Sequence, residues 1–209
     1  MISFDYAANQ IGGVWRLAFS QFQQDGDKRA DTDLDYSVDG FFKSFWAIPF
    51  SAPFAILGFI AARRFIERFD SDALTAIQGA PMATMIGVNS LAFLADWALS
   101  VSAIIAVAKA LNATNAVSNT IVGYNWATMV ITAINALVLV LISFLGKAAS
   151  ALAIPAMAVT LALLWGVFRR LMNTTPGTTI AIIIILTLIS FIVSAGFGAA
   201  ATSLLQPTS

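Results

Sequence analysis

The chain has 209 residues, of which 59% are hydrophobic and only 11% are charged, whereas soluble globular domains carry roughly a quarter charged residues. Together with a mean hydropathy of +0.84, this composition excludes an ordinary soluble domain. Eleven basic and eleven acidic side chains give a formal net charge of zero, so the overall charge does not favour nucleic acid as a partner. The composition indicates an integral membrane protein, with the lipid bilayer as its first partner.

The sequence contains no Cys and no His, which excludes disulfide frameworks, thiol nucleophiles, His general bases and nearly every zinc, copper or haem site. Intramembrane metalloproteases and Ser–His proteases need His, aspartyl proteases need a second membrane acid, and no Gly-rich phosphate loop with a Lys is present. We therefore expect a non-enzymatic protein with no catalytic residue, no cofactor and no metal site.

Residues 1–40 are predicted to form a tail in front of the membrane domain. Apolar residues recur at helical spacing from Ile11 to Phe22 and predict an amphipathic helix. We expect this helix to lie in the membrane interface with Trp15 at headgroup depth. The alternative is a helix that packs on another subunit or lacks order in isolation.

An acidic stretch, 25–40, follows this helix and resembles a calcium loop only superficially, through Asp31, Asp33, Asp35 and Asp39. An EF-hand loop starting at Asp31 would need Gly at its sixth position and Glu at its twelfth, where the chain has Tyr36 and Phe42. We expect a solvated linker that caps the first span through Ser37 or Asp39.

Five stretches are long and apolar enough to cross a bilayer, since a hydrocarbon core about 30 Å thick requires about 20 apolar residues of helix. We therefore predict an all-α, polytopic membrane bundle over residues 41–209, with the interfacial helix in front of it. The predicted spans are 41–62, 82–110, 120–145, 149–170 and 179–204.

The first span is the least regular, because Pro49 and Pro53 each remove a backbone donor. It is either a kinked transmembrane helix or a re-entrant hairpin. The segment after it, 62–81, mixes basic and apolar side chains and predicts a second surface helix that ends near Gly79.

Basic residues near the span ends favour a cytoplasmic N-terminus and an outer C-terminus in a bacterial inner membrane. This orientation reverses if the first span is re-entrant. We expect Trp15, Arg63, Arg64, Arg169 and Arg170 to act as interfacial anchors. One side receives Arg16, Lys28, Arg29, Lys43, Lys109, Arg169 and Arg170, and the other receives Arg63, Arg64, Arg68 and Lys147.

Asp96 is the only acidic residue well inside a span. A charge at this depth costs about 2.5 to 3.5 kcal/mol, so the side chain should be protonated, paired or exposed to water. The third span offers a matching surface, a stripe at a helical period that is polar except at Leu139. The stripe consists of Asn125, Thr128, Thr132, Asn135, Leu139 and Ser143. The predicted intramembrane polar cluster consists of Asp96, Asn89, Ser100, Thr128, Thr132 and Asn135.

Two interpretations of this cluster are open. Asp96 is either a proton- or cation-coupled site, as intramembrane acids often are in transporters, or a hydrogen-bonded helix contact worth about 0.6 to 2 kcal/mol. The fifth span separately shows small residues at strict four-residue spacing, which predict a helix-packing seam, either internal or against another subunit. The seam consists of Ser190, Ser194, Gly198 and Thr202.

Motifs in the later spans resemble the bacterial branch of the Yip-domain membrane proteins. Gly123 and Tyr124 open the third span in VGYNWATMV, and the fourth ends in LLWGVFRRLM, with Trp165 a few residues before two arginines. A short loop and a very apolar last span follow. The chain departs from the family pattern at Ala127 and Thr128, where a Pro is expected soon after the Gly–Tyr pair.

This resemblance implies a non-enzymatic protein that works through contacts with other membrane proteins. Its eukaryotic relatives serve vesicle traffic and bind small GTPases, but no residues for that contact carry over to this chain. We therefore expect a scaffold, assembly factor or accessory subunit of a larger membrane complex, bound to a membrane-protein partner or to further copies of itself. The alternatives are a small proton- or cation-coupled transporter or channel that uses Asp96, and a membrane-shaping protein that inserts its N-terminal helix.

Overall fold

The computed structural model describes residues 2–19, 34–69 and 81–205, except for the side chains of Lys147 and residues 201–205. The predicted features at Phe22, Lys28, Arg29, residues 31–33 and Gly79 lie outside the described residues. Within the described ranges every regular element is a helix. The longer elements are α1 (Phe4–Phe19), α2 (Val38–Ser44), α3 (Ala47–Phe69), α5 (Met82–Ala110), α6 (Val117–Leu145), α7 (Ala153–Gly166) and α8 (Pro176–Leu205), and the short ones are η3 (Thr114–Ala116), η4 (Lys147–Leu152) and η5 (Val167–Leu171).

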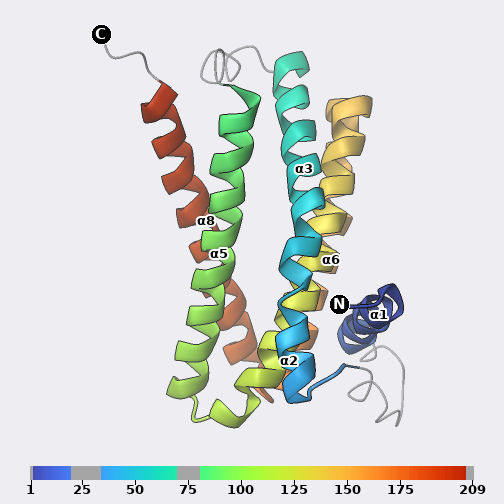
Figure 1. Ribbon diagram of the computed structural model, residues 1–209, viewed down its shortest axis with the longest axis vertical. Helices are drawn as coiled ribbons and strands as arrows, with labels where there is room; N and C mark the ends of the chain where they lie inside the picture. The colour runs from blue at the N-terminus through green and yellow to red at the C-terminus, as the bar shows by residue number, and fades with distance from the viewer. Residues whose placement is uncertain (1, 20–33, 70–80, 206–209) are drawn as a thin grey trace.

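Five helical segments are long and apolar enough to cross a membrane, and successive segments run in opposite directions (Figure 1). This arrangement confirms the predicted all-α, polytopic membrane bundle. The chain is a multi-pass membrane protein. The segments are Val38–Phe69, Met82–Ala110, Thr114–Leu145, Ala148–Leu171 and Pro176–Ala200.

The first segment is a broken helix that traverses the bundle. The break lies at Phe45 and Trp46, between α2 and α3, and Pro49 falls in the first turn of α3, where a missing backbone donor costs little. Helix α3 then continues past Pro53 to Phe69 at the opposite end of the bundle (Figure 1). Of the two predicted alternatives for this span, the structure has the kinked transmembrane helix and not the re-entrant hairpin.

The start of the predicted surface helix after the first span is a continuation of α3. Residues 62–69, which include Arg63 and Arg64, form its last two turns. The prediction of a separate surface helix is wrong for these residues. The polar side chains end the apolar pattern without ending the helix, because Arg and Glu are good helix formers.

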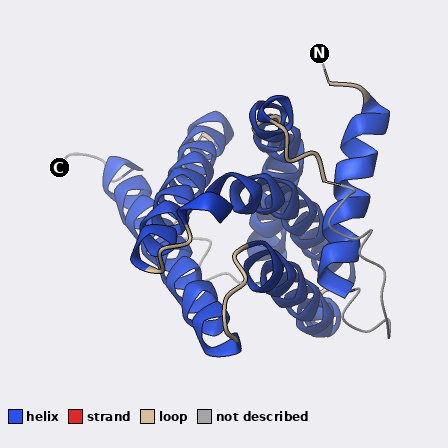
Figure 2. Ribbon diagram, turned by 90° about the horizontal axis from the view of Figure 1, so that it is seen from below, coloured by secondary structure: helices blue, strands red, loops and turns tan. Residues whose placement is uncertain are grey.

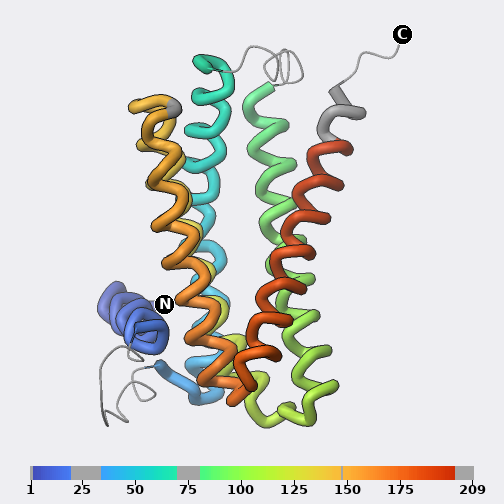
Figure 3. Tube along the Cα trace, turned by 180° about the vertical axis from the view of Figure 1, so that it is seen from behind, coloured from blue at the N-terminus to red at the C-terminus, as the bar shows by residue number. Residues whose placement is uncertain are grey.

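The long helices form two pairs. Helix α3 packs along α6, with α7 against α6, and α5 packs along α8; the two pairs meet at the lower end and diverge toward the upper end (Figures 1 and 3). Gly58 of α3 lies against Ala136 of α6, where an added Cβ would be in ordinary van der Waals contact, 3.4 Å from the Ala136 Cα. Small residues at such contacts replace the hydrophobic driving force that lipid cannot supply.

Helix α1 lies across the outside of the bundle, against α6 and α7 (Figure 2). Val14, Leu17 and Ala18 are fully buried in this contact, whereas Trp15 is 42% exposed. The apolar face that the sequence assigned to lipid is thus covered by the bundle. Helix α1 therefore packs against the membrane-spanning helices.

The docking site of α1 is made by Gly166 at the end of α7. An added Cβ at Gly166 would lie 2.7 Å from the Ala18 Cα and 2.8 Å from the Leu17 carbonyl oxygen. Only a residue without a side chain allows the two backbones to come this close. This contact could not be recognised from the sequence, because α1 and α7 are far apart in the chain.

A polar clasp ties α1 to α2 through Asp35. One carboxylate oxygen accepts a hydrogen bond from the Ser37 hydroxyl at 2.5 Å, and the other accepts one from the Tyr6 hydroxyl at 3.2 Å. The Asp35 backbone N–H donates to the Gln10 side-chain oxygen at 3.0 Å. Ser37 also caps α2 by accepting from the Gly40 N–H at 3.0 Å, which confirms one of the two predicted caps.

The clasp shifts two pKa values in opposite directions. The hydrogen bond from the Ser37 hydroxyl, aided by the Ser37 N–H, the Tyr6 hydroxyl and the charge of Lys43, holds the pKa of Asp35 below its usual value. Burial, followed by the negative charge of Asp35, raises the pKa of the Tyr6 phenol. The clasp is therefore complete when Asp35 is ionised and Tyr6 is protonated.

We expect Gly166→Val to detach α1 from the bundle, because the new side chain would overlap the backbone of Leu17 and Ala18. Overpacking of this kind costs about 1 to 3 kcal/mol, so amide hydrogen exchange of residues 4–19 should accelerate roughly tenfold or more. Gly177→Val is the control, since an added Cβ there meets no atom within 4 Å. Unchanged exchange in Gly166→Val would contradict the docking of α1.

We expect the clasp to loosen in acid. The folded pKa of Asp35 lies below the unfolded value of about 3.9, so its stabilisation is present above that value and is lost as the pH falls through the folded pKa. Spin labels on Asn9 of α1 and Met157 of α7 should report a broader distance distribution below about pH 4. Asp35→Asn should show the broad distribution at neutral pH, and Asp5→Asn, on the exposed face of α1, should not. A distance distribution that stays narrow in Asp35→Asn would show that the Asp35 carboxylate does not hold α1 in place.

Candidate functional site

Asp96 is the middle residue of the 29-residue helix α5. Its side chain is partly buried and accepts a hydrogen bond from the Ser190 hydroxyl of α8 at 2.7 Å. The sequence pointed to the third span for the partner of Asp96, whereas the hydrogen bond comes from the first residue of the predicted seam. The bond links the two helices of one pair at mid-depth.

A cavity of about 410 Å³ lies between the two helix pairs, above this bond. Residues of α3, α5, α6 and α8 line it, and most of them are apolar or small. This volume falls within the range of small-molecule sites, about 300 to 1,000 Å³. The polar residues in its lining are Asn89, Ser90, Asp96, Thr132, Asn135 and Ser194.

Four of the six predicted cluster residues thus share the cavity, and two do not. Ser100 and Thr128 lie beside the hydroxyl of Tyr124 instead. Tyr124 and Ser100 are buried, so they form part of the packed interior. A helical stripe fixes the direction of side chains but not which neighbouring helix fills the space in front of each one.

The cavity presents hydrogen-bond acceptors. The Asn89 amide donates to the Met85 carbonyl of its own helix at 2.9 Å, and the Thr132 hydroxyl donates to the Thr128 carbonyl at 2.8 Å. Their oxygen atoms keep acceptor capacity, as does the carboxyl group of Asp96. The ion pairs among the described residues do not include Asp96. The site is therefore suited to a hydrogen-bond donor or a cation.

The predicted seam is divided between the interior and the surface. Ser190 bonds to Asp96 and Ser194 lines the cavity. Gly198 is exposed, and an added Cβ there would meet no atom within 4 Å. The side chain of Thr202 lies outside the described residues.

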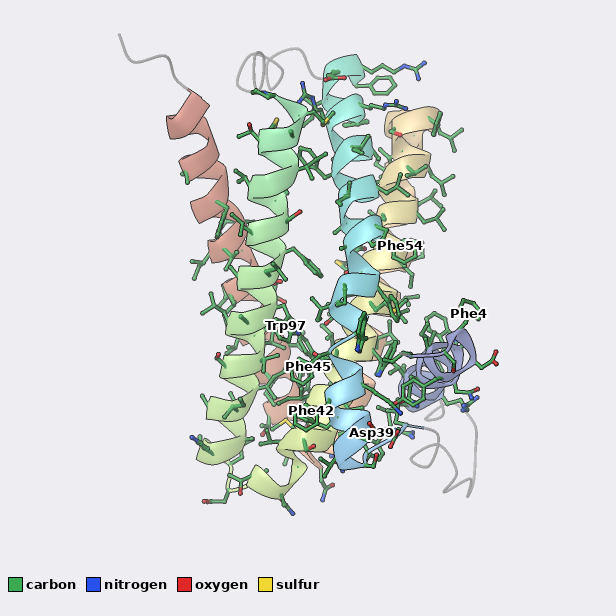
Figure 4. All side chains as sticks on the ribbon, in the orientation of Figure 1. Phe4, Asp39, Phe42, Phe45, Phe54 and Trp97 are labelled. Carbon is green, nitrogen blue, oxygen red and sulfur yellow. The ribbon has the colours of Figure 1, made fainter. Side chains whose placement is uncertain are left out.

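A buried polar network below the cavity was not predicted. The Trp97 indole N–H donates to the Asn125 side-chain oxygen at 2.9 Å, and the Asn125 amide donates to the Ser44 hydroxyl at 3.0 Å. Ser44 in turn donates to the Phe41 carbonyl at 2.7 Å. Phe45 and Trp97 face one another between α2 and α5, with ring centroids 5.8 Å apart (Figure 4).

This network joins α2, α5 and α6 at the lower part of the bundle. Asn125 and Ser44 have no exposed surface, so their polar groups depend on one another. The sequence contained one signal, the Asn at the start of the polar stripe. The sequence could not reveal that Asn125 bonds to Trp97 rather than to the neighbouring Asp96.

The predicted arginine anchors lie at opposite ends of the bundle. Arg63 pairs with Glu67 at 2.8 Å and reaches the Met85 sulfur at 3.4 Å, which connects the upper ends of α3 and α5. Arg169 donates to the Thr174 carbonyl at the lower end, in the turn before α8.

No family model, curated protein or solved structure matches this chain.

We expect Asn125→Leu to destabilise the bundle by about 1 to 2 kcal/mol, because it leaves the buried Trp97 indole N–H without an acceptor and removes the hydrogen bond that the Ser44 hydroxyl oxygen accepts. Unfolding in mixed micelles with increasing dodecyl sulfate should measure this loss. Asn89→Leu is the matched control, since the Asn89 amide bonds only to its own helix backbone. Equal stability of the two variants would show that the network contributes little.

Proposed function

We propose that this protein is a non-enzymatic accessory subunit or scaffold of a larger membrane complex. The observation that carries the proposal is the partly open cavity between the two helix pairs, which diverge toward the upper end (Figures 1 and 3). A partly open space between membrane helices offers a place where a transmembrane helix of another protein can pack. The resemblance to Yip-domain proteins, which work through contacts with other membrane proteins, agrees with this proposal.

The walls of the cavity support helix binding. Ala55 and Ala62 lie on the α3 side of the cavity and Ala92 lies on the α5 side. Membrane helices associate through van der Waals packing, and small residues let their backbones approach closely. These three positions would allow a partner helix to lie deep between the pairs.

A small transporter or channel is the second candidate, favoured by the acceptor-rich lining around Asp96. In this function Asp96 would bind a proton or cation together with Asn89, Thr132 and Asn135. Such a protein must move its solute across the bilayer. Uptake into proteoliposomes that Asp96→Asn abolishes would support the transporter and count against the accessory subunit.

We further propose a bacterial inner membrane with the lower end of the bundle, and the N-terminus, in the cytoplasm. Five described basic residues lie at the lower end, namely Arg16, Lys43, Lys109, Arg169 and Arg170, against Arg63, Arg64 and Arg68 at the upper end.

Topology can be measured by labelling single cysteines in intact cells, because the chain has no native Cys. An impermeant maleimide should label a cysteine at Ala151 and not one at Asn173, which are exposed at the upper and lower ends respectively. Labelling of Asn173→Cys but not of Ala151→Cys would show the opposite orientation.

The accessory-subunit proposal is testable with a photo-crosslinker of nearly the same shape as Phe. Benzoylphenylalanine at Phe59 or Phe93, both in the cavity wall, should form adducts with one and the same membrane protein in native membranes. At Phe191, which is 71% exposed on α8 and outside the cavity lining, it should not form that adduct. Isolation of a monomer that shows no adduct from either cavity position would contradict the proposal.

A further inference from the structure

The cavity contains an acid that the described part of the chain does not neutralise. Asp96 lies midway along α5, receives one hydrogen bond from Ser190, and belongs to none of the ion pairs among the described residues. A carboxylate can accept about four hydrogen bonds, so most of its capacity is unused. A charged carboxylate at mid-membrane depth costs about 2.5 to 3.5 kcal/mol on insertion scales unless it is protonated, exposed to water or paired.

No Lys or Arg is among the residues that line the cavity, so the described lining supplies no counter-charge for Asp96. The Asn89 amide and the Thr132 hydroxyl donate to carbonyl groups of their own helices, and their oxygen atoms can still accept hydrogen bonds in the cavity. A cationic partner for Asp96 would therefore come from outside the described part of this chain.

We propose that the cavity receives a transmembrane helix of a partner protein that carries one Lys or Arg in the middle of its span, and that this cation pairs with Asp96. The inference rests on the accessory-subunit function and specifies its partner. Charged residues inside membranes commonly pair with one another. Pairing across two chains would satisfy both ions only in the assembled complex, so it would make association selective.

The shape of the site favours a helix over a free solute. The residues that line the cavity run along α3 from Phe54 to Ala62 and along α5 from Ile86 to Asp96. This is an elongated space at the level where a partner helix would run. Its volume of about 410 Å³ accommodates a long basic side chain together with its neighbours on such a helix.

A second copy of this chain does not meet the charge requirement. The basic residues of its spans lie near their ends, at Lys43, Arg63, Lys109 and Arg169 among others, and none lies at the depth of Asp96. The occupant is therefore a different protein.

The test uses the full-length chain in phosphatidylcholine liposomes, with a fluorescent donor on Asn115→Cys in the exposed lower loop. The probes are acceptor-labelled spanning peptides of about 20 Leu and Ala residues, identical except for a central Lys, Leu or Glu. Energy transfer should show that the Lys peptide binds about tenfold or more tightly than the Leu peptide. The Glu peptide should bind no better than the Leu peptide.

Two variants assign the binding to this site. Asp96→Asn keeps an acceptor for the Ser190 hydroxyl but removes the charge, so it should abolish the preference for Lys over Leu. Ala92→Phe should block the cavity and remove binding of both peptides, whereas Ala98→Phe, exposed on α5 outside the cavity lining, should retain it.

Several results would overturn the proposal. These are equal binding of the Lys and Leu peptides, a Lys preference that survives Asp96→Asn, energy transfer between two copies of the chain that Ala92→Phe abolishes, or binding of decylammonium at Asp96 without any discrimination among peptides. The outcome is separable from that of the accessory-subunit proposal. If benzoylphenylalanine at Phe59 captures a partner whose spans contain no central basic residue, the charge pairing fails while the accessory function stands.

Discussion

A carboxyl group at the midpoint of an apolar, 29-residue helix constrains how this bundle is arranged. Hydrocarbon cannot solvate Asp96, so the face of α5 that carries it must turn toward protein. It turns toward Ser190 of α8 and toward the cavity, and the opposite faces carry apolar side chains. Ile184, Leu188 and Phe191 of α8 are exposed to the surroundings, as expected where lipid is the solvent.

The helices are joined by side-chain hydrogen bonds and close packing at the lower end of the molecule. The Trp97–Asn125–Ser44 network joins α2, α5 and α6, and α1 adds a further layer by docking at Gly166. Asp35 then fastens α1 to α2 through side-chain hydrogen bonds. Helix α1 and the residues around Asp35 therefore pack as part of the described bundle.

The sequence was sufficient to predict the five spans. Hydropathy and length identify them because the lipid bilayer permits few spanning structures other than long apolar helices. The span 82–110 coincides with α5, and the cap at Ser37 follows from local chemistry. Features that depend on contacts between distant segments were missed. The burial of α1 depends on the absence of a side chain at Gly166. An amphipathic pattern alone does not show whether lipid or protein covers the apolar face of a helix.

The candidate site was predicted in part for the same reason. Asn89, Asp96, Thr132 and Asn135 share the cavity because helical periodicity gives the direction of each side chain. Ser190 was assigned to a packing seam by its spacing, and its bond to Asp96 depends on the pairing of α5 with α8. Asn125 belonged to the predicted stripe, but its role in the network depends on the positions of Trp97 and Ser44.

The two helix pairs pack closely at the lower end and diverge toward the upper end (Figure 3), where Arg63 of α3 still reaches the Met85 sulfur of α5. A helix of 25 residues is about 37 Å long, so a rotation of about 5° at the lower junction moves its far end by about 3 Å. Small rearrangements around the Asn125 network would therefore be amplified into changes of width at the upper end. The packing of the lower end thus sets the separation of the two helix pairs at the upper end.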